Sequence, residues 1–199
     1  MAAGASYRVL FRRRRQGRTD YRLRRRLVIS RRARLVARGS LRHMIVQIIR
    51  AGLKGDEVVV SANSSELREF GWRGPSGNIP AAYLTGLLLG YKAKAAGIEG
   101  AIVDLGLQSP SRGMRAFAAV KGALDGGLKI ACEEKILPDL ARIRGEHVAK
   151  YAAQTSSSDL DGYKRAFSSY LAENLKPESL PEHFDQVKSE LEKVRSGSR

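Results

Sequence analysis

Sulfur ligands are nearly absent from this chain of 199 residues, whose single cysteine is Cys132. One cysteine excludes a disulfide framework and any metal site built from several thiolates. Long apolar runs are also missing, since the apolar segment 79–89, which contains Leu87–Leu89, is far too short to span a bilayer. No apolar signal stretch opens the chain, so we expect a cytoplasmic protein.

Acidic residues are scarce at one end of the chain. The first 54 residues contain seventeen basic residues, sixteen of them Arg, against one acid, Asp20. The other residues carry nineteen basic and nineteen acidic side chains, so the net charge of +16 belongs to the first 54. Guanidinium binds phosphate bidentately and stacks on bases, which ammonium cannot do. Nucleic acid is therefore the first partner to expect.

An arginine-rich arm also has other interpretations: a solvated tail, a nuclear address or a patch that binds a membrane surface. A membrane patch needs a coherent apolar face, and Tyr7, Phe11 and Tyr21 are too sparse to build one. These aromatic residues among arginines suit stacking on unpaired bases instead. Such an arm contacts mainly phosphates, so it indicates no sequence specificity by itself. The candidate contacts of the basic region are Tyr7, Arg8, Phe11, Arg12, Arg13, Arg14, Arg15, Arg18, Tyr21, Arg22, Arg24, Arg25, Arg26, Arg31 and Arg32.

Secondary-structure patterns predict an α/β fold. Three strands joined by short turns are expected at 34–38, 42–50 and 57–61. Helices are expected at 64–71, 78–97, 113–124 and 139–151, with further strands at 101–105 and 129–131. This order predicts a mixed sheet, in which an antiparallel three-strand meander adjoins a parallel βαβ part, covered by helices. Gly86 and Gly90 are expected to allow the second helix to pack closely on the sheet.

The chain divides into three parts by composition. Residues 1–30 form the basic arm, which contains a short helix capped by Thr19 or Asp20, and residues 31–155 form the α/β core. A polar linker is expected at 155–159, followed by a helical tail over 156–199 that is broken at Pro177 and Pro181. The apolar stripes of the tail are Phe167, Tyr170, Leu171 and Leu175, then Phe184, Val187, Leu191 and Val194.

The turn between the first two strands is a second candidate for RNA contact. A hairpin turn at Gly39-Ser40 needs no function, but Arg38, Arg42 and His43 surround it. Three cationic or titratable side chains at one end of a sheet form a reasonable edge to face RNA.

Other sites are disfavoured by the sequence. The loop 71–78 is rich in glycine and opens a helix, but it lacks the lysine and the spacing of a P-loop. Trp72, within it, is expected to be a core lid. The three histidines, His43, His147 and His183, have no ligand partners at metal-site spacing, so no metal and no cofactor is expected.

One carboxylate keeps an enzyme interpretation open. Asp104 ends a buried strand, where an RNase-H-like nuclease would hold a metal ligand, but such a site needs more acids than Asp56 and Glu57 supply. A chromosomal or general DNA-coating protein is the alternative among binding functions.

Several motifs resemble those of one family. They are Tyr7-Arg8-Val9 with the run from Arg12 to Arg22, Gly71-Trp72, Gly77–Gly86, Lys121–Asp125 and Arg142–His147. In this order, over roughly residues 7–153, they resemble the archaeal form of the eighteenth protein of the large ribosomal subunit.

The resemblance implies an α/β core, no catalysis, and binding to 5S rRNA in the central protuberance. Its implied partners are 5S rRNA, the large-subunit rRNA and neighbouring ribosomal proteins, including the other 5S-associated protein. The family's RNA-contacting arm and sheet edge correspond here to Arg12–Arg15, Arg18, Arg22, Arg38, Ser40, Arg42 and His43. Arg112 is the candidate from the loop after Asp104, where Gln108–Arg112 departs from the family pattern.

Overall fold

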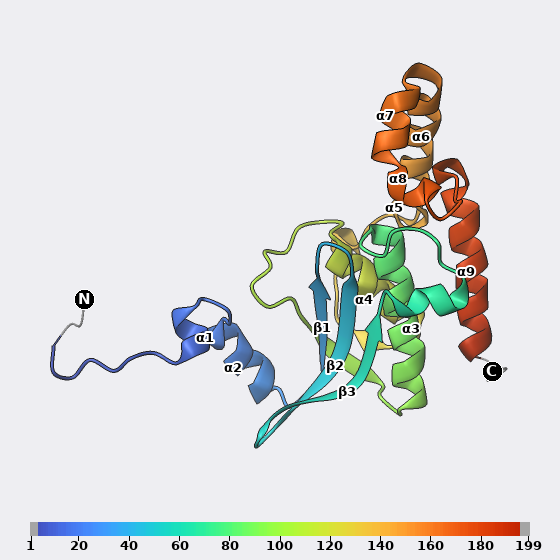
Figure 1. Ribbon diagram of the computed structural model, residues 1–199. Coiled ribbons are helices and arrows are strands. Elements are labelled where there is room, and N and C mark those ends of the chain that lie inside the picture. Colours follow the sequence, from blue (N-terminus) through green and yellow to red (C-terminus); the bar gives the residue numbers. More distant parts are fainter. Residues whose placement is uncertain (1–3, 196–199) are drawn as a thin grey trace.

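A five-stranded sheet with the order β3-β2-β1-β4-β5 organises the body of the computed structural model, which describes residues 4–195 (Figure 1). The strands are β1 (Arg34–Gly39), β2 (Met44–Gly52), β3 (Gly55–Asn63), β4 (Gly100–Asp104) and β5 (Lys129–Ile130). The first three form an antiparallel meander, and β4 pairs in parallel with both β1 and β5. The predicted mixed α/β sheet is confirmed.

The β1–β2 turn is longer than the sequence predicts, and β2 begins at Met44 instead of Arg42. The Ser40 backbone N–H donates to the His43 carbonyl over 2.8 Å, and the His43 N–H donates to Ser40 Oγ over 2.9 Å. These bonds close Ser40–His43 into a turn. Leu41 and Arg42 therefore project from the sheet, with Leu41 fully exposed.

Two helices, α3 (Ile79–Ala95) and α4 (Arg115–Asp125), cover one face of the sheet. Asn78 caps α3 as predicted, because its Oδ1 accepts a hydrogen bond from Ala81 N over 2.9 Å. Pro80 fits the first turn, where no backbone donor is needed. The short 3-10 helix η1 (Glu66–Phe70) ends at Gly71, which has a positive φ of 85°.

The sequence predicts that Gly86 and Gly90 pack on the sheet, and this prediction is wrong. Both residues pack against α4. A Cβ added to Gly86 would overlap the Ala119 backbone, and one added to Gly122 would overlap the Tyr83 carbonyl. Gly90 and Gly126 face each other in the same way. The backbones of α3 and α4 therefore cross at a distance that only glycine allows.

The basic arm extends away from the body and contains two helices, α1 (Arg12–Arg15) and α2 (Tyr21–Ile29) (Figure 1). Asp20 caps α2 as predicted, since its carboxylate accepts from Arg22 N over 2.9 Å and Leu23 N over 3.1 Å. Neither helix has a buried residue. Leu23 and Leu27 are half-buried on the side of α2 that faces the sheet.

The segment after β5 holds a 3-10 turn, η2 (Glu134–Ile136), and two helices where one was expected. These are α5 (Leu140–Arg144) and α6 (Glu146–Ser158), separated by Gly145 at a φ of +80°. The expected linker at Thr155–Asp159 is wrong, because α6 continues to Ser158. The hydroxyls of Ser157 and Ser158 donate to the Gln154 carbonyl, so these polar residues remain within the helix.

The tail returns to the core. Its elements are α7 (Leu160–Ala166), α8 (Ser168–Leu171), η3 (Pro177–Ser179) and α9 (Leu180–Arg195). Pro181 does not break a helix, since it lies in the first turn of α9. Both predicted stripes join the same hydrophobic core as the sheet, through Phe167, Tyr170 and Leu175, and through Phe184, Val187 and Leu191. Leu171 is exposed instead, and the side chain of Val194 lies outside the described part of the chain.

Trp72 is buried beneath the tail, as the lid interpretation predicts. Its ring stacks on His183 of α9 with 5.2 Å between centroids. His183 Nε2 accepts a hydrogen bond from the Arg73 backbone N–H over 3.1 Å, so that nitrogen carries no proton. Burial, and secondarily the charge of Arg73, lowers the pKa of His183 below its ordinary value.

This contact predicts a pH dependence of the free energy of unfolding. Because the folded state lowers the pKa of His183, its stabilisation is present above about pH 6.5 and is lost as pH falls through the folded pKa. Urea denaturation at pH 7.5 and pH 5 measures the difference. In His183→Phe, which keeps the stacking but has no proton to gain, the difference between the two pH values should shrink. An unchanged difference would assign the pH dependence to other groups.

Candidate nucleic-acid interface

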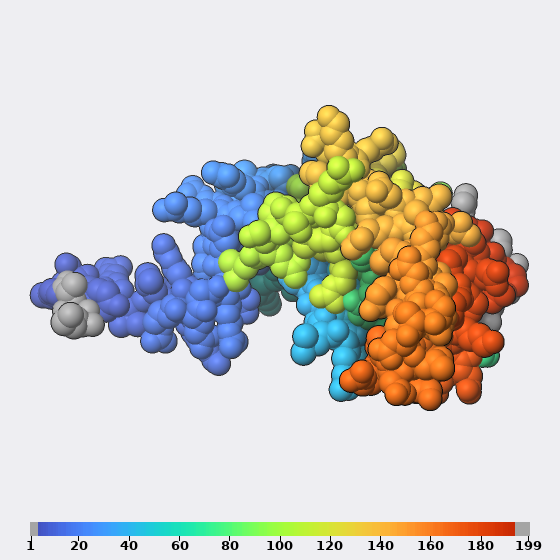
Figure 2. Space-filling view, turned by 90° about the horizontal axis from the view of Figure 1, so that it is seen from above, coloured from blue at the N-terminus to red at the C-terminus, as the bar shows by residue number. Residues whose placement is uncertain are grey.

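The arginines of the arm form an exposed surface beside the sheet. Arg12–Arg15, Arg18, Arg22, Arg25 and Arg26 are all exposed, and Arg24 is half-buried. Tyr7, Phe11 and Tyr21 are exposed among them, with Phe11 at 86%. Figure 2 shows the arm as a separate projection that is open to solvent. The structure therefore leaves most of these guanidinium groups and all three aromatic rings open to solvent.

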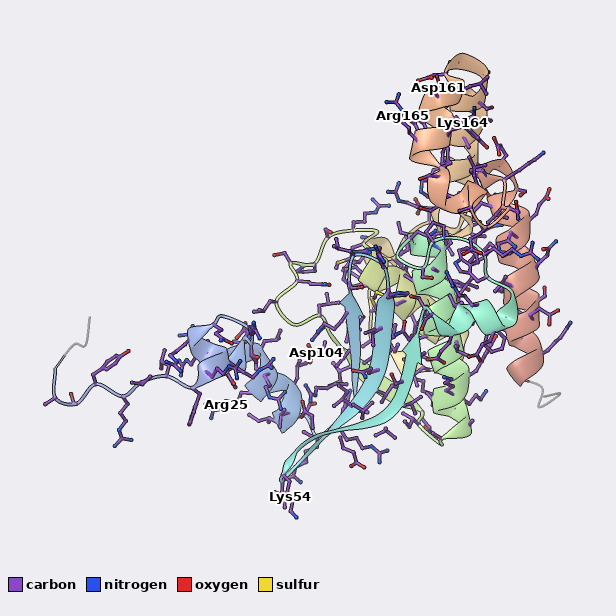
Figure 3. The ribbon with its side chains drawn as sticks, viewed as in Figure 1. Arg25, Lys54, Asp104, Asp161, Lys164 and Arg165 are labelled. Atoms are coloured by element: carbon purple, nitrogen blue, oxygen red, sulfur yellow. The ribbon has the colours of Figure 1, made fainter. Side chains whose placement is uncertain are left out.

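The alternation along β1 directs two more arginines toward the arm. Leu35 and Ala37 enter the hydrophobic core on the side of the helices. Since neighbouring strand residues point to opposite faces, Arg34 and Arg38 face the other side. Asp104, the last residue of β4, lies on the side of the sheet toward the arm (Figure 3).

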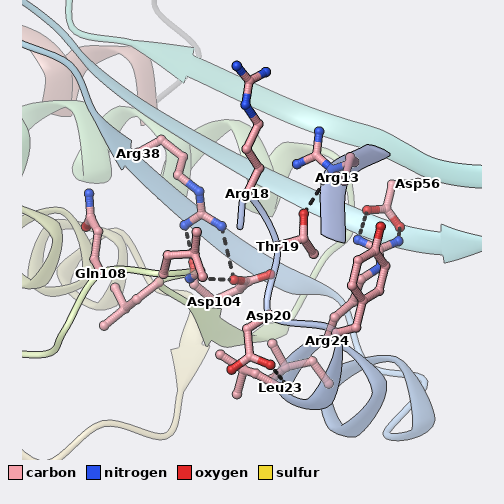
Figure 4. Close-up of a pocket in the computed structure, with 15 residues that line it drawn as sticks. Arg13, Arg18, Thr19, Asp20, Leu23, Arg24, Arg38, Asp56, Asp104 and Gln108 are labelled. Atoms are coloured by element: carbon pink, nitrogen blue, oxygen red, sulfur yellow. Dashed lines mark hydrogen bonds and ion pairs between the residues drawn. The ribbon is translucent and has the colours of Figure 1, made fainter. Parts of the chain in front are cut away.

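A cleft of about 780 Å³ separates the arm from this face of the sheet (Figure 4). Its lining residues are Arg13, Arg18, Thr19, Asp20, Tyr21, Leu23, Arg24, Leu27, Arg38, Asp56, Asp104, Leu105, Gly106, Leu107 and Gln108. Arg13 Nε donates to Thr19 Oγ1 over 2.9 Å and thereby folds α1 back toward α2. The cleft joins the arm, the end of β1 and the loop after β4 in one concave surface, which four arginines and three aspartates line.

Asp104 does not have the free carboxylate that a metal-dependent nuclease requires. Arg34 Nη1 lies 3.1 Å from Oδ2, Arg38 Nη2 lies 3.1 Å from Oδ1, and Gly106 N donates to Oδ1 over 2.9 Å. Arg38 Nη1 also donates to the Asp104 carbonyl over 2.7 Å. These donors occupy both oxygens, so Asp104 joins the end of β4 to β1.

Asp56, the other acid of the cleft, is also paired. Arg24 binds it bidentately over 2.7 and 2.8 Å, and Arg34 Nη2 lies 2.8 Å from Oδ1. The hydrogen bond from Arg24 is the main cause that lowers the pKa of Asp56, and it raises the pKa of Arg24 in turn. Asp56 therefore stays ionised and joins the arm helix to β3.

The β1–β2 turn presents Ser40 and Arg42 to solvent, with His43 half-buried beside them. His43 Nδ1 lies 3.4 Å from Ser64 Oγ, which holds the ring toward the end of the sheet. Arg115 supports the turn from below, since its Nη1 donates to the Ser40 carbonyl over 3.2 Å and to the Gly77 carbonyl over 2.7 Å. The turn is therefore fixed to the glycine-rich loop before α3.

Arg112, Arg31 and Arg32 are exposed. Arg112 is in the loop 105–114, which follows β4 and lies beside the β1–β2 turn across a hollow shared by Gln108, Ser109 and Arg115. Arg31 and Arg32 connect α2 to β1, at the end of β1 opposite the turn. The loop after β4 therefore lies between the arm, which it meets in the cleft, and the turn.

Sequence reasoning missed Arg24, Asp56 and Arg115 in their positioning roles. Arg115 has no pattern that marks it, because its partners are backbone carbonyls 38 and 75 residues away. Asp56 offered a weak signal as one of the first acids after the basic segment. Only the folded sheet shows which arginine it meets.

Comparison with known proteins gives two findings. The family described as ribosomal large subunit proteins 60S L5 and 50S L18 matches residues 5–99. The chain is also 52% identical over 194 residues to a protein of Thermofilum pendens named large ribosomal subunit protein uL18. That alignment covers 98% of this chain and 99% of the relative. Separately, no helix within the described residues is long and apolar enough to cross a membrane.

Proposed function

Because this chain belongs to the uL18 family of large ribosomal subunit proteins, we propose that it binds 5S rRNA and helps to attach it to the large subunit. Its role in the subunit is structural and not enzymatic. The proposed site in the subunit is the central protuberance. The proposed partners are 5S rRNA, the large-subunit rRNA and neighbouring proteins, including the other 5S-associated protein.

The observation that carries the proposal is the cleft that the arm shares with the sheet. The arm supplies exposed arginines that follow a phosphate path, and the cleft connects them to Arg38 at the end of β1. Phosphate contacts position an RNA, whereas groups held in fixed geometry discriminate its shape. The arm can adapt to the path of the phosphates, while the end of β1 holds its side chains in a fixed geometry. Together they are suited to binding one particular folded RNA.

The three parts of the chain take different roles in this proposal. Residues 1–30 supply most of the charge that attracts RNA. The core, 31–155, presents Arg38, Ser40, Arg42 and His43 in a fixed arrangement. In the tail, 156–199, the described residues up to 195 pack on the core. The projecting helices α6–α8 carry Asp161, Lys164 and Arg165 at their end (Figure 3). We propose that their exposed side contacts a neighbour in the subunit.

Competition binding tests the function directly. Labelled archaeal 5S rRNA transcript is bound to the full-length protein and displaced with unlabelled 5S rRNA, with unrelated structured RNA or with duplex DNA. Displacement by 5S rRNA at much lower concentration supports the proposal. Equal displacement by all three competitors would favour a general nucleic-acid coating protein.

Replacing Arg42 and His43 with Ala is expected to lower discrimination between 5S rRNA and unrelated RNA by about tenfold, with a smaller loss of total affinity. The reason is that the turn is fixed by Ser40 and Arg115, so its side chains meet only an RNA of the right shape. Filter binding with both RNAs measures the ratio. The control is Arg50→Ala, which removes an exposed arginine from the opposite end of β2. Uniform weakening toward both RNAs would make the turn a simple phosphate contact.

A further inference from the structure

Five charged residues form an alternating chain across the open face of the sheet. Arg24 of α2 binds Asp56 of β3 over 2.7 and 2.8 Å, and Asp56 lies 2.8 Å from Arg34 of β1. Arg34 then lies 3.1 Å from Asp104 of β4, which lies 3.1 Å from Arg38 of β1. The chain therefore connects the arm helix to the end of β1 through four elements. Figure 4 draws its two ends, Arg24 with Asp56 and Arg38 with Asp104.

Burial is greatest in the middle of this chain and least at its ends. The side chain of Arg34 is 3% exposed and that of Asp104 is 10% exposed. Arg24 and Arg38, at the two ends, are 36% and 42% exposed. The middle is locked by the surrounding protein, while the terminal guanidinium groups open into the cleft. Each end thus has one side held by an aspartate and another side available to a ligand.

The two aspartates reduce the repulsion between the guanidinium groups of Arg24, Arg34 and Arg38. Three guanidinium groups on one face of a small sheet repel one another, and the whole arm adds to the repulsion. Arg34 Nε and Nη2 make no hydrogen bond within residues 4–195, and Nη2 lies 2.8 Å from Asp56 as an ion pair alone. This buried side chain therefore depends on the charge of its two carboxylates. Without Asp56 and Asp104, neither Arg34 nor the approach of α2 to the sheet would be favourable.

We propose that Asp56 and Asp104 are positioning residues for RNA binding, which hold helix α2 and the end of β1 that carries Arg38 in one fixed arrangement before the RNA arrives. The inference rests on the proposed function and goes beyond it, since it assigns a favourable role to two acids in a surface that binds a polyanion. Simple charge counting gives the opposite expectation, because neutralising an acid raises the attraction for RNA.

Asp56 is the better residue to test, because Asp104 lies in the buried middle of the chain and its replacement risks unfolding. The adjacent Glu57 is a matched control: it is exposed, lies on the same strand and has no ion pair in the part of the chain that the structure describes. Asp56→Asn and Glu57→Gln change the net charge equally. Asp56→Glu keeps the charge and serves as the conservative variant.

Full-length proteins are compared for binding to archaeal 5S rRNA transcript and to an unrelated structured RNA. Glu57→Gln is expected to bind both RNAs about twofold more tightly, from its charge alone. Compared with wild type, Asp56→Asn should bind 5S rRNA about tenfold more weakly. Its affinity for unrelated RNA should not fall below that of wild type. Asp56→Glu should recover part of the loss. If Asp56→Asn matches Glu57→Gln toward both RNAs, the inference is overturned while the proposed function stands.

Hydrogen exchange of the free proteins distinguishes a local positioning role of Asp56 from a global effect on stability, because a global effect would change exchange in the core strands as well as in α2. Backbone amides of residues 24–29 should exchange faster in Asp56→Asn than in wild type, with the core strands unchanged. Equal exchange of α2 in both proteins would overturn the positioning role. If the wild-type protein shows no preference for 5S rRNA, the proposed function is refuted. The titration of the wild-type protein is enough to show this, so failure of the proposed function is distinguished from failure of the inference.

Discussion

Deletion of residues 1–30 is expected to lower the affinity for 5S rRNA about a thousandfold at moderate salt and to leave the body folded. Neither arm helix contributes a buried residue, so the hydrophobic core loses little. An arm that neutralises about six phosphates gives a log–log salt slope near −5, and most of that slope should disappear with the arm. Filter binding between 50 and 200 mM salt and circular dichroism of the truncated protein measure the two effects.

The control variant keeps the positive charge of the arm but replaces guanidinium groups with ammonium groups. In this variant Arg12–Arg15 and Arg18 become Lys, so the salt slope should remain while the affinity at fixed salt falls, because ammonium lacks the bidentate geometry of guanidinium. A truncated body that unfolds, or one that binds 5S rRNA as tightly as the full chain, would contradict the role of the arm.

Replacing Gly86 with Val is expected to cost about 3 kcal/mol or more of stability, which is a large share of the total for a domain of this size. A side chain at this position meets the Ala119 backbone of α4, which has no rotamer to change. The sign of Gly86→Ala is equally informative. Helix propensity alone would stabilise by about 1 kcal/mol, so a loss of stability shows that the close crossing of α3 and α4 dominates.

Urea denaturation followed by circular dichroism measures both variants. The comparison is Gly162→Ala in helix α7, where the nearest atoms belong to the side chain of Asp159, the N-cap of α7, so the largest loss expected is that of one cap. That change should stay within about 1 kcal/mol of wild type. Wild-type stability in Gly86→Val would mean that the two helices can separate without cost.

Local patterns predicted most of the core, because they act over a few residues. Asn78 followed by Pro80 fixed the start of α3, and the apolar alternation gave the meander. The errors came from contacts distant in sequence. The run Thr155–Ser158 has the composition of a linker, but its hydroxyls satisfy backbone carbonyls within α6. Gly86 has a partner helix that no local pattern specifies.

In the candidate site, too, some features follow from the local sequence and others depend on contacts between residues far apart in the chain. The charge of the arm follows from counting residues, whereas its geometry follows from Asp56, whose partner Arg24 lies 32 residues earlier. Asp104 was noticed as a carboxylate at the end of a strand. Its arginine partners lie 66 and 70 residues away, so their effect on its chemistry could not be predicted from its neighbours in the chain.

The packing of α9 on the core has a consequence for the order of events during synthesis. Leu180, Phe184, Val187 and Leu191 complete the hydrophobic core, yet they are made after every other described element. The arm is made first. At about 5–20 residues per second, its arginines stay exposed for about 10–40 seconds beside a core that is still open. The nascent chain therefore combines a polycation with uncovered apolar surface, a pairing that favours aggregation on any nearby RNA, and rapid capture of the arm would protect it.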